Sequence, residues 1–218
     1  MTDTNLFNEL MQLQSRLGNI NQSEGESESQ YDDDEEGDDD GDVLEEQQDI
    51  TDLVGALGVF LANTYSVYHE AHGFHWNVKG PDFAQYHALF SGIYEDLIES
   101  VDAIAENILK LGYDSPFKMS DMMAMTTIPE SENYDDDEEE DTPLDMAVDL
   151  LASVSALEGE AKELFELADD ADEQGVANFV AERIDALQKT MWQLRASANM
   201  QKPAMIMKKT VRISLGNE

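Results

Sequence analysis

Apolar residues recur with a helical period over most of the chain between residues 49 and 199. In four long stretches the apolar side chains fall three or four residues apart, which places them on one face of an α-helix. No stretch in this span alternates apolar and polar residues over the length of a strand. The pattern therefore predicts an all-α fold with four long helices. The stretches run from Leu53 to Tyr68, Phe83 to Leu111, Leu144 to Phe165 and Val176 to Leu194.

Glycine, proline and a capping residue separate these helices. Gly73, Gly80 and Pro81 are expected to break the chain between the first and second helices. The third helix opens with Thr142 and Pro143. A capping residue followed by proline is a typical helix start, because the first turn does not need the missing N–H.

The connection between the second and third helices is long and covers residues 112–141. It contains the methionine-rich segment 119–125, which predicts a short helix, and an acidic insertion at 130–141. Two long helices on either side of a long connection are typical of a four-helix bundle with a crossover between helices 2 and 3. We therefore expect one bundle over residues 49–200.

Negative charge is concentrated outside the predicted helices. The chain has 49 acidic and 12 basic residues, a net charge of −37, and residues 1–50 hold 17 of the acids. Residues 22–48 combine like charges with few large apolar groups, so we expect an acidic extension over 1–48 that is disordered. A short amphipathic helix is predicted within it at 5–21. The segment 1–21 is either a docking peptide for a protein partner or a frayed tail.

Composition excludes several classes of protein. The chain has no cysteine, which excludes disulfides, thiolate metal sites and cysteine nucleophiles. Such an acidic chain repels duplex DNA, which excludes DNA binding through a globally basic surface. No run of 18 apolar residues occurs, so we expect no membrane span. The N-terminus lacks the basic flank and apolar stretch of a signal peptide, and we expect a cytoplasmic protein.

The histidines narrow the candidate chemistry. All four lie between residues 69 and 87. The sequence HEAH, which begins at His69, is one residue short of the HExxH motif that binds zinc. No Glu-x-x-His occurs, so the ferritin-type di-iron carboxylate motif is missing.

Four remaining donors, His75, His87, Asp102 and Glu106, form a candidate metal site. Asp102 and Glu106 are four residues apart and share one helix face. His87 precedes Asp102 by 15 residues on the same helix, about 22 Å, so the two cannot bind one ion within a single chain. One site would therefore need both histidines from one subunit and both acids from its two-fold mate. Imidazole and carboxylate suit Fe(II), Mn(II) or Zn(II), whereas a solvated helix face would give the same spacing.

A longer string of residues points to a family. HWNVKG at 75–80, followed by His87 and by DAIAE at 102–106, resembles the signature of the Dps family of mini-ferritins. The resemblance covers about residues 49–200 and implies that the four-helix bundle with its crossover between helices 2 and 3 is ferritin-like. It implies a hollow dodecamer built from two-fold dimers, which oxidises Fe(II), preferably with hydrogen peroxide, and stores ferric iron inside. In that family the ferroxidase centre lies between two-fold-related subunits, in agreement with the distance argument.

The resemblance also assigns roles to individual residues. It implies that His75 and His87 bind iron from one chain, and that Asp102 and Glu106 bind it from the other. Zn(II) or Mn(II) are alternatives to iron at the same donors. Trp76 would sit beside the centre, where its indole either gives up an electron to intercept radicals or only packs.

Position 91 departs from the family pattern. The family usually has an aspartate four residues after the second histidine, and this chain has Ser91. Because a hydroxyl is a weaker and neutral ligand, we expect weaker binding at the second metal position. The result is either a working but altered centre or an inactive shell. Glu99, about one turn before Asp102, is a candidate compensating ligand.

An acidic cluster is predicted to start the fourth helix. Similar acids in the Dps family line a three-fold pore that admits cations, and acids are also favoured at a helix N-terminus. Both roles stay open for this cluster. Its members are Asp169, Asp170, Asp172 and Glu173.

The basic C-terminal tail, residues 201–218, holds the candidate DNA contacts. DNA-binding members of the Dps family generally use a lysine-rich terminal tail, but the acidic N-terminus here opposes DNA, so we expect no binding at physiological salt. The alternatives to iron storage are a DNA-packing shell that uses this tail and a catalytically weak scaffold that displays the N-terminal helix. The candidate contacts are Lys202, Lys208, Lys209 and Arg212.

Overall fold

The structure is a computed structural model that describes residues 40–128 and 142–198. Within these ranges it contains five helices and no strand. Their bounds are α2 Asp40–Asn77, α3 Phe83–Lys110, α4 Met119–Met125, α5 Pro143–Asp170 and α6 Gln174–Ser197. The predicted helix at 5–21, the acidic insertion at 130–141 and the basic tail at 201–218 lie outside the described residues.

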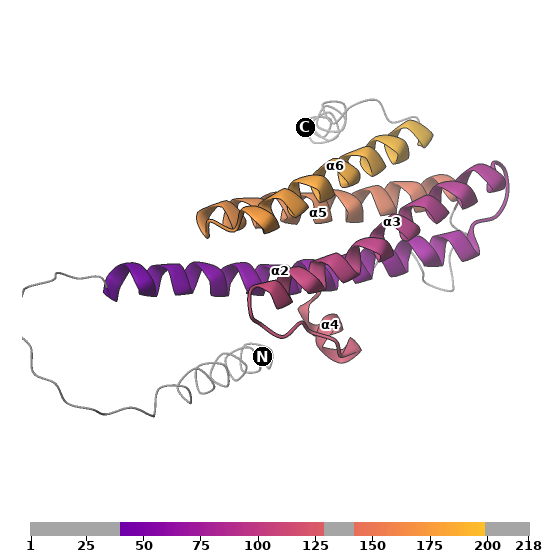
Figure 1. Ribbon diagram of the computed structural model, residues 1–218. Helices are drawn as coiled ribbons and strands as arrows, with labels where there is room; N and C mark the ends of the chain where they lie inside the picture. Colours follow the sequence, from indigo (N-terminus) through magenta and orange to yellow (C-terminus); the bar gives the residue numbers. More distant parts are fainter. Residues whose placement is uncertain (1–39, 129–141, 199–218) are drawn as a thin grey trace, which may run out of the picture. The chain divides into compact units, whose positions relative to one another are not determined.

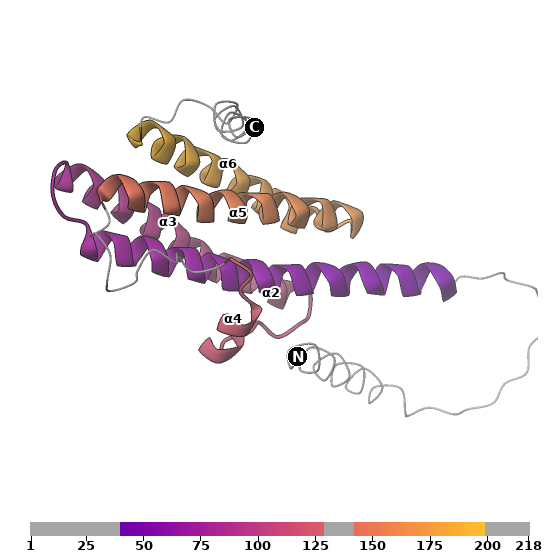
Figure 2. The same ribbon diagram turned by 180° about the vertical axis from the view of Figure 1, so that it is seen from behind.

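The four long helices pack as two antiparallel pairs, α2 with α3 and α5 with α6 (Figure 1). α2 also packs along α5, which joins the two pairs into one bundle. The short helix α4 lies against α2, and Figure 2 shows it on the side of α2 away from the α5–α6 pair. The prediction of a four-helix bundle with a crossover between the second and third long helices is confirmed.

The core is made from the apolar faces that the periodicity predicted. Burial of these side chains is the main driving force for folding. Residues Gln47–Asn77 of α2 are long and apolar enough to cross a membrane, but half of their most apolar window is buried inside the bundle, as in a core helix. The largest fully buried side chains are Leu53, Leu57, Phe60, Leu61, Phe74, Phe90, Leu97, Ile104, Ile108, Leu150, Leu157 and Leu164.

The predicted start of the first helix is wrong. α2 begins at Asp40, so the disorder expected over 22–48 does not hold for its last nine residues. Two physical effects favour the helix there. Acidic residues in a first helical turn interact favourably with the helix dipole, and the Glu–Gln run at 45–48 consists of good helix formers.

The predicted break at Gly73 is also wrong, because α2 continues through it to Asn77. A glycine inside a helix costs about 1 kcal/mol, and the burial of the neighbouring Phe74, which is 1% exposed, offsets this. The side-chain amide of Asn77 also donates to the Gly73 carbonyl at 2.8 Å. The chain turns later, where Gly80 and Asp82 have φ of 86° and 61°, in the left-handed region.

Two local predictions in the second half of the chain are confirmed, the start of α5 and the short helix α4. Thr142 caps α5 in a capping box: its hydroxyl accepts from the Asp145 N–H at 3.3 Å, and the Asp145 carboxylate accepts from the Thr142 N–H at 3.1 Å. Pro143 occupies the first helical turn. The methionine-rich segment forms α4 over the predicted residues. These features depend on neighbours in sequence, which is why the sequence alone predicts them.

A buried amide fastens the end of the crossover to the bundle. Asn63 on α2 is fully buried, and its Nδ2 donates to both carboxylate oxygens of Glu160 on α5 at 2.8 and 2.7 Å. Its Oδ1 accepts from the Thr126 hydroxyl at 2.7 Å and from the Thr127 N–H at 2.8 Å. One side chain thus connects α2, α5 and the segment that follows α4.

Glu70 on α2 has a largely buried carboxyl group that, unlike the Asn63 amide, is not fully hydrogen-bonded. Oε1 of Glu70 is buried and has no hydrogen-bond partner among the described residues. Burial raises the pKa of Glu70 to about 7; a hydrogen bond with Ser153 lowers it, and the charge of Asp149 raises it further. The folded state therefore binds this proton more tightly than the unfolded chain. The stability that this tighter proton binding adds to the folded state is fully present below pH 4.5 and is lost as the pH rises through 7.

We expect Glu70→Gln to stabilise the protein at pH 8 by about 2 kcal/mol, after allowance for partial exposure, and to have little effect near pH 4.5. The neutral amide removes the cost of a buried charge, which exists only where the carboxyl ionises. Denaturant unfolding at the two pH values measures the difference. Glu163→Gln, at an exposed position on α5, is the matched control. A gain at Glu70 that is equal at both pH values would contradict this explanation.

Candidate metal centre

His75, near the end of α2, and His87, near the start of α3, face each other across the turn that joins the two helices. Their rings stack with centroids 3.8 Å apart and planes at 20°. Nδ1 of His75 lies 3.0 Å from the carbonyl oxygen of His87, and Nδ1 of His87 lies 2.9 Å from the carbonyl oxygen of His75. The turn at residues 78–82 thus brings the two predicted ligands together.

These reciprocal contacts fix the protonation pattern of both rings. A carbonyl oxygen only accepts, so Nδ1 of each histidine must carry the proton and donate it. In a neutral imidazole the other nitrogen, Nε2, then keeps its lone pair, which is the form that binds a metal. A backbone carbonyl on the second nitrogen is a usual support for a metal-binding histidine. His75 and His87 are therefore prepared as a two-nitrogen donor.

The two predicted carboxylates lie elsewhere on the same chain. Asp102 and Glu106 are exposed on α3, one helical turn apart. Fifteen residues of continuous helix separate Asp102 from His87, about 22 Å. Among the described residues no three of His, Cys, Asp and Glu lie close enough to hold a metal ion. One chain therefore supplies two separate pairs of donors.

Ser91 is not an isolated hydroxyl. Its Oγ donates to Oε1 of Glu95, one turn further along α3, at 3.0 Å. A carboxylate thus contacts the position at which this chain lacks the expected aspartate. Glu95 was not among the predicted ligands, although its spacing of four residues from Ser91 was the available signal.

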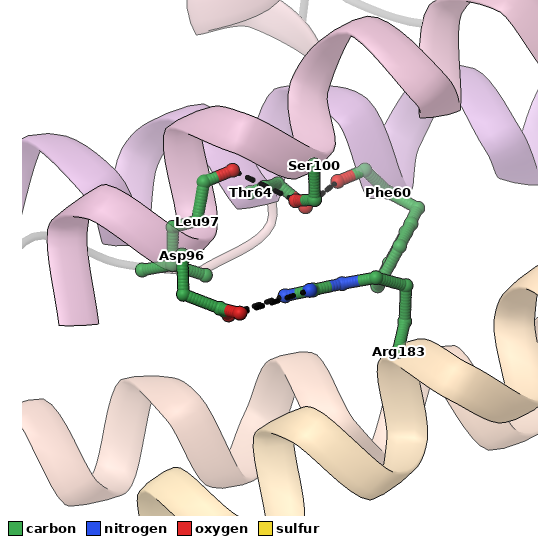
Figure 3. A network of polar contacts seen from close by, with 6 residues as sticks. All are labelled: Phe60, Thr64, Asp96, Leu97, Ser100 and Arg183. Atoms are coloured by element: carbon green, nitrogen blue, oxygen red, sulfur yellow. Dashed lines mark hydrogen bonds and ion pairs between the residues drawn. The ribbon is translucent and has the colours of Figure 1, made fainter. Parts of the chain in front are cut away.

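Glu99, the predicted compensating ligand, borders a groove between α3 and α6. The groove has a volume of about 330 Å³. Beside it, Arg183 on α6 donates to both carboxylate oxygens of Asp96 at 2.8 and 3.4 Å (Figure 3). The carboxylate in contact with Ser91 is that of Glu95, whereas Glu99 shares its groove with the Arg183–Asp96 ion pair.

Aromatic side chains surround the histidine pair on one side. Trp76 is 63% exposed, and its ring lies 4.2 Å from that of His72, centroid to centroid. Tyr94 on α3 stacks on His72 at 4.2 Å and meets the edge of His75 at 5.1 Å. The hydroxyl of Tyr68 lies 3.1 Å from Nδ1 of His72. The sequence predicted Trp76 beside the centre but not Tyr68, His72 or Tyr94, although Tyr68, His72 and Trp76 repeat every four residues on α2.

The acidic cluster does not start one helix as predicted. Asp169 and Asp170 are the last residues of α5, where the helix dipole disfavours acids. Asp172 lies in the turn with φ of 54°, and Glu173 is the N-cap of α6. The prediction failed because α5 extends to Asp170, two residues into the cluster. A stabilising role at a helix N-terminus is therefore excluded for Asp169 and Asp170.

Comparison with known proteins gives the family. The ferritin-like domain matches residues 55–201. The DNA protection during starvation protein of Helicobacter pylori is 29% identical over 135 residues, which are 62% of this chain and 90% of that protein. The protein of the same name from Brevibacillus brevis is 28% identical over 136 residues, which are 62% of this chain and 87% of that protein.

Solved structures agree with this assignment. A Dps protein from Vibrio cholerae O1, described as a member of a broad superfamily of ferritin-like diiron-carboxylate proteins, matches with a TM-score of 0.62 and 28% identity over 68% of this chain and 90% of its own. A Dps protein from Bacillus brevis matches with a TM-score of 0.63 and 26% identity over 68% of this chain and 96% of its own. The chain therefore belongs to the ferritin-like superfamily and, within it, to the Dps family.

Proposed function

We propose that this protein is a mini-ferritin that oxidises Fe(II) with hydrogen peroxide at centres shared between two-fold-related subunits. It stores the ferric product in a hollow cytoplasmic dodecamer. Membership of the Dps family supports iron storage at the family level. The observation that carries the finer proposal is the histidine pair, whose Nδ1 protons are engaged by backbone carbonyls while each Nε2 keeps its lone pair.

The separation of the donors supports a shared site. An isologous dimer in which two copies of α3 run antiparallel brings His87 of one chain towards the carboxylate pair of the other. Each dimer then contains two equal centres. In each, the carboxylates of Asp102 and Glu106 balance the two charges of Fe(II), and the neutral imidazoles of His75 and His87 add the nitrogen ligands. Zn(II) and Mn(II) compete for the same donors.

Iron is the substrate here, and the protein has to place it for oxidation. Two Fe(II) ions supply the two electrons that reduce one hydrogen peroxide and two protons to two waters. The second ion needs anionic ligands near position 91, where Ser91 is neutral. We propose that Glu95 supplies this carboxylate, because it already contacts the Ser91 hydroxyl at 3.0 Å. The longer glutamate side chain starts one turn further along α3, so the second ion binds, but weakly.

Iron entry is assigned to the acidic cluster at the α5–α6 turn. Asp169, Asp170 and Asp172 are exposed there. Acids at the C-terminal end of a helix cost stability, so their presence at the end of α5 supports a role outside folding. In the proposed dodecamer these carboxylates line a pore for cations. The two alternative functions are a scaffold that displays the N-terminal helix and a DNA-packing shell that uses the basic tail. They depend on residues 1–21 and 201–218, which lie outside the described residues.

Anaerobic Fe(II) titration of the purified oligomer, followed by a pulse of hydrogen peroxide, tests the proposal. We expect saturable Fe(II) binding at the inter-subunit sites and rapid growth of ferric absorbance. His75→Ala is expected to lose both. Oxidation no faster than that of iron in buffer would contradict the proposal.

Position 91 gives a separate prediction. We expect Ser91→Asp to tighten Fe(II) binding at the second position, roughly tenfold, because an anionic ligand replaces a neutral one. Glu95→Gln is expected to weaken the same position. Anaerobic titration calorimetry with Fe(II) measures both variants. If neither substitution changes the second binding step, neither position contributes to the centre.

A further inference from the structure

A groove at one end of the bundle has no part in the proposed iron chemistry. It lies where the turn between α2 and α3, the start of α5 and the end of α6 come together, at the same end of the bundle in Figure 1. Its volume is about 490 Å³, which is ordinary for a cleft that binds a ligand. The groove is therefore large enough for several side chains of a docked segment.

The groove offers mainly apolar contacts. Leu144, in the first turn of α5, lines it and is 44% exposed. Pro81, in the turn between α2 and α3, lines it as well and is exposed. One acid and one base, Asp82 and Lys79, share the lining, so their formal charges balance. An apolar segment that covers Leu144 and Pro81 gains the free energy of removing their surface from water.

The last described residues of the chain form part of the groove wall. α6 ends at Ser197, and both Ser197 and Ala198 line the groove. The hydroxyl of Tyr86 on α3, a residue that is 7% exposed, donates to the Ser197 carbonyl oxygen at 3.1 Å. This contact holds the end of α6 against the start of α3. Residues 199–218 therefore begin at the groove.

The sequence of this tail contains a short apolar segment close to its start. Residues 203–207 read PAMIM and lie between Lys202 and Lys208. The segment begins five residues after Ala198, which an extended chain covers in about 17 Å. Pro203 disfavours a continuation of α6. Methionine side chains are unbranched and adapt to irregular apolar surfaces. The segment thus has the composition and the reach to fold back onto the groove.

The other apolar segment of the termini, at 5–21, is less suited to this groove. α2 begins at Asp40 and ends at Asn77, beside the groove, so its start is about 55 Å away. Residues 22–39 would have to be almost fully extended, over about 60 Å, to bring the segment there. Residues 199–202 need no such extension, and this short tether gives the tail a high effective concentration at the groove.

We propose that the groove is the docking site for residues 203–207 of the same chain. The apolar side chains of this segment cover Leu144 and Pro81. Docking holds the neighbouring cations Lys202 and Lys208 against the bundle, so they do not extend towards DNA. This agrees with the expectation that the chain does not bind DNA at physiological salt. The inference does not depend on the ferroxidase function.

Spin labelling of the assembled, iron-free protein tests the docking. The chain has no cysteine, so Lys208→Cys gives one site per chain for a nitroxide label directly after the apolar segment. We expect an electron paramagnetic resonance spectrum dominated by an immobilised component. Leu144→Asp places a charge in the groove, whereas an acid in the first turn of α5 is favourable for the helix. The immobilised fraction should then fall by about fivefold or more.

Val148→Asp is the matched control, because Val148 is 36% exposed one turn after Leu144 on α5 and does not line the groove. It should keep the immobilised fraction. A mobile label in the protein with Leu144 and Val148 intact, or an immobilised fraction that Leu144→Asp does not reduce, would overturn the proposal.

A cysteine pair identifies the chain that supplies the docked segment. Leu144→Cys combined with Met205→Cys should form a disulfide within one chain, which migrates as a monomer on a non-reducing gel. A disulfide-linked dimer would mean that the tail of a second copy occupies the groove. That result, or the absence of any disulfide, overturns docking within the chain.

Discussion

Replacement of His87 by alanine is expected to reduce Fe(II) oxidation by peroxide to the rate of iron in buffer. The substitution removes one of the two neutral nitrogen ligands and should weaken Fe(II) binding by roughly 100-fold. The backbone carbonyl of residue 87 remains, so His75 keeps the acceptor for its Nδ1 proton. The expected loss of oxidation rate therefore reports the missing His87 ligand and not a changed position of His75. Stopped-flow absorbance of ferric iron measures the rate.

His69→Ala is the control for this experiment. His69 is an exposed histidine on α2, six residues before His75, and it is outside the proposed centre. We expect the wild-type rate in this variant. A His87→Ala protein that oxidises iron as fast as His69→Ala would contradict the assignment of His87 as a ligand.

The second large effect is expected on stability. Asn63→Ala should lower the free energy of unfolding by about 3 kcal/mol, because hydrogen bonds to a charged group are lost and buried polar partners stay unpaired. The affected partners are the Glu160 carboxylate, the Thr126 hydroxyl and the Thr127 N–H. Denaturant unfolding followed by circular dichroism at fixed protein concentration measures the change.

Asn77→Ala is the matched substitution for Asn63. Asn77 is an exposed asparagine on the same helix whose amide donates to the Gly73 carbonyl. We expect a loss below about 1 kcal/mol there, as is usual for surface positions. Similar losses at the two positions would mean that the buried amide does not fasten the crossover.

The sequence predicted those parts of the fold that depend on local pattern. The helix pairs, the capping box at Thr142 and the short helix α4 all follow from periodicity and capping chemistry within a few residues. The failures at Asp40 and Gly73 have a different origin. Helix dipole and tertiary burial outweighed the local signals for disorder and for a break.

The candidate site was predictable to a similar extent. Spacing along α3 was enough to separate His87 from Asp102 and to imply two chains. The reciprocal contacts of His75 and His87 depend on the shape of the turn between α2 and α3, which no pattern of residues specifies. The Asn63–Glu160 contact joins residues 97 positions apart, and a lone asparagine on an apolar helix face gave no local signal for it.

The central claim is that each iron centre takes its histidines from one chain and its carboxylates from another. Shells assembled from an equal mixture of His87→Ala and Asp102→Ala chains test it directly. Each variant alone should be inactive. In a mixed dimer one centre has lost both ligands and the other is intact, so random pairing should restore about a quarter of the wild-type oxidation rate. A mixture that stays as inactive as its two parents would contradict the shared centre.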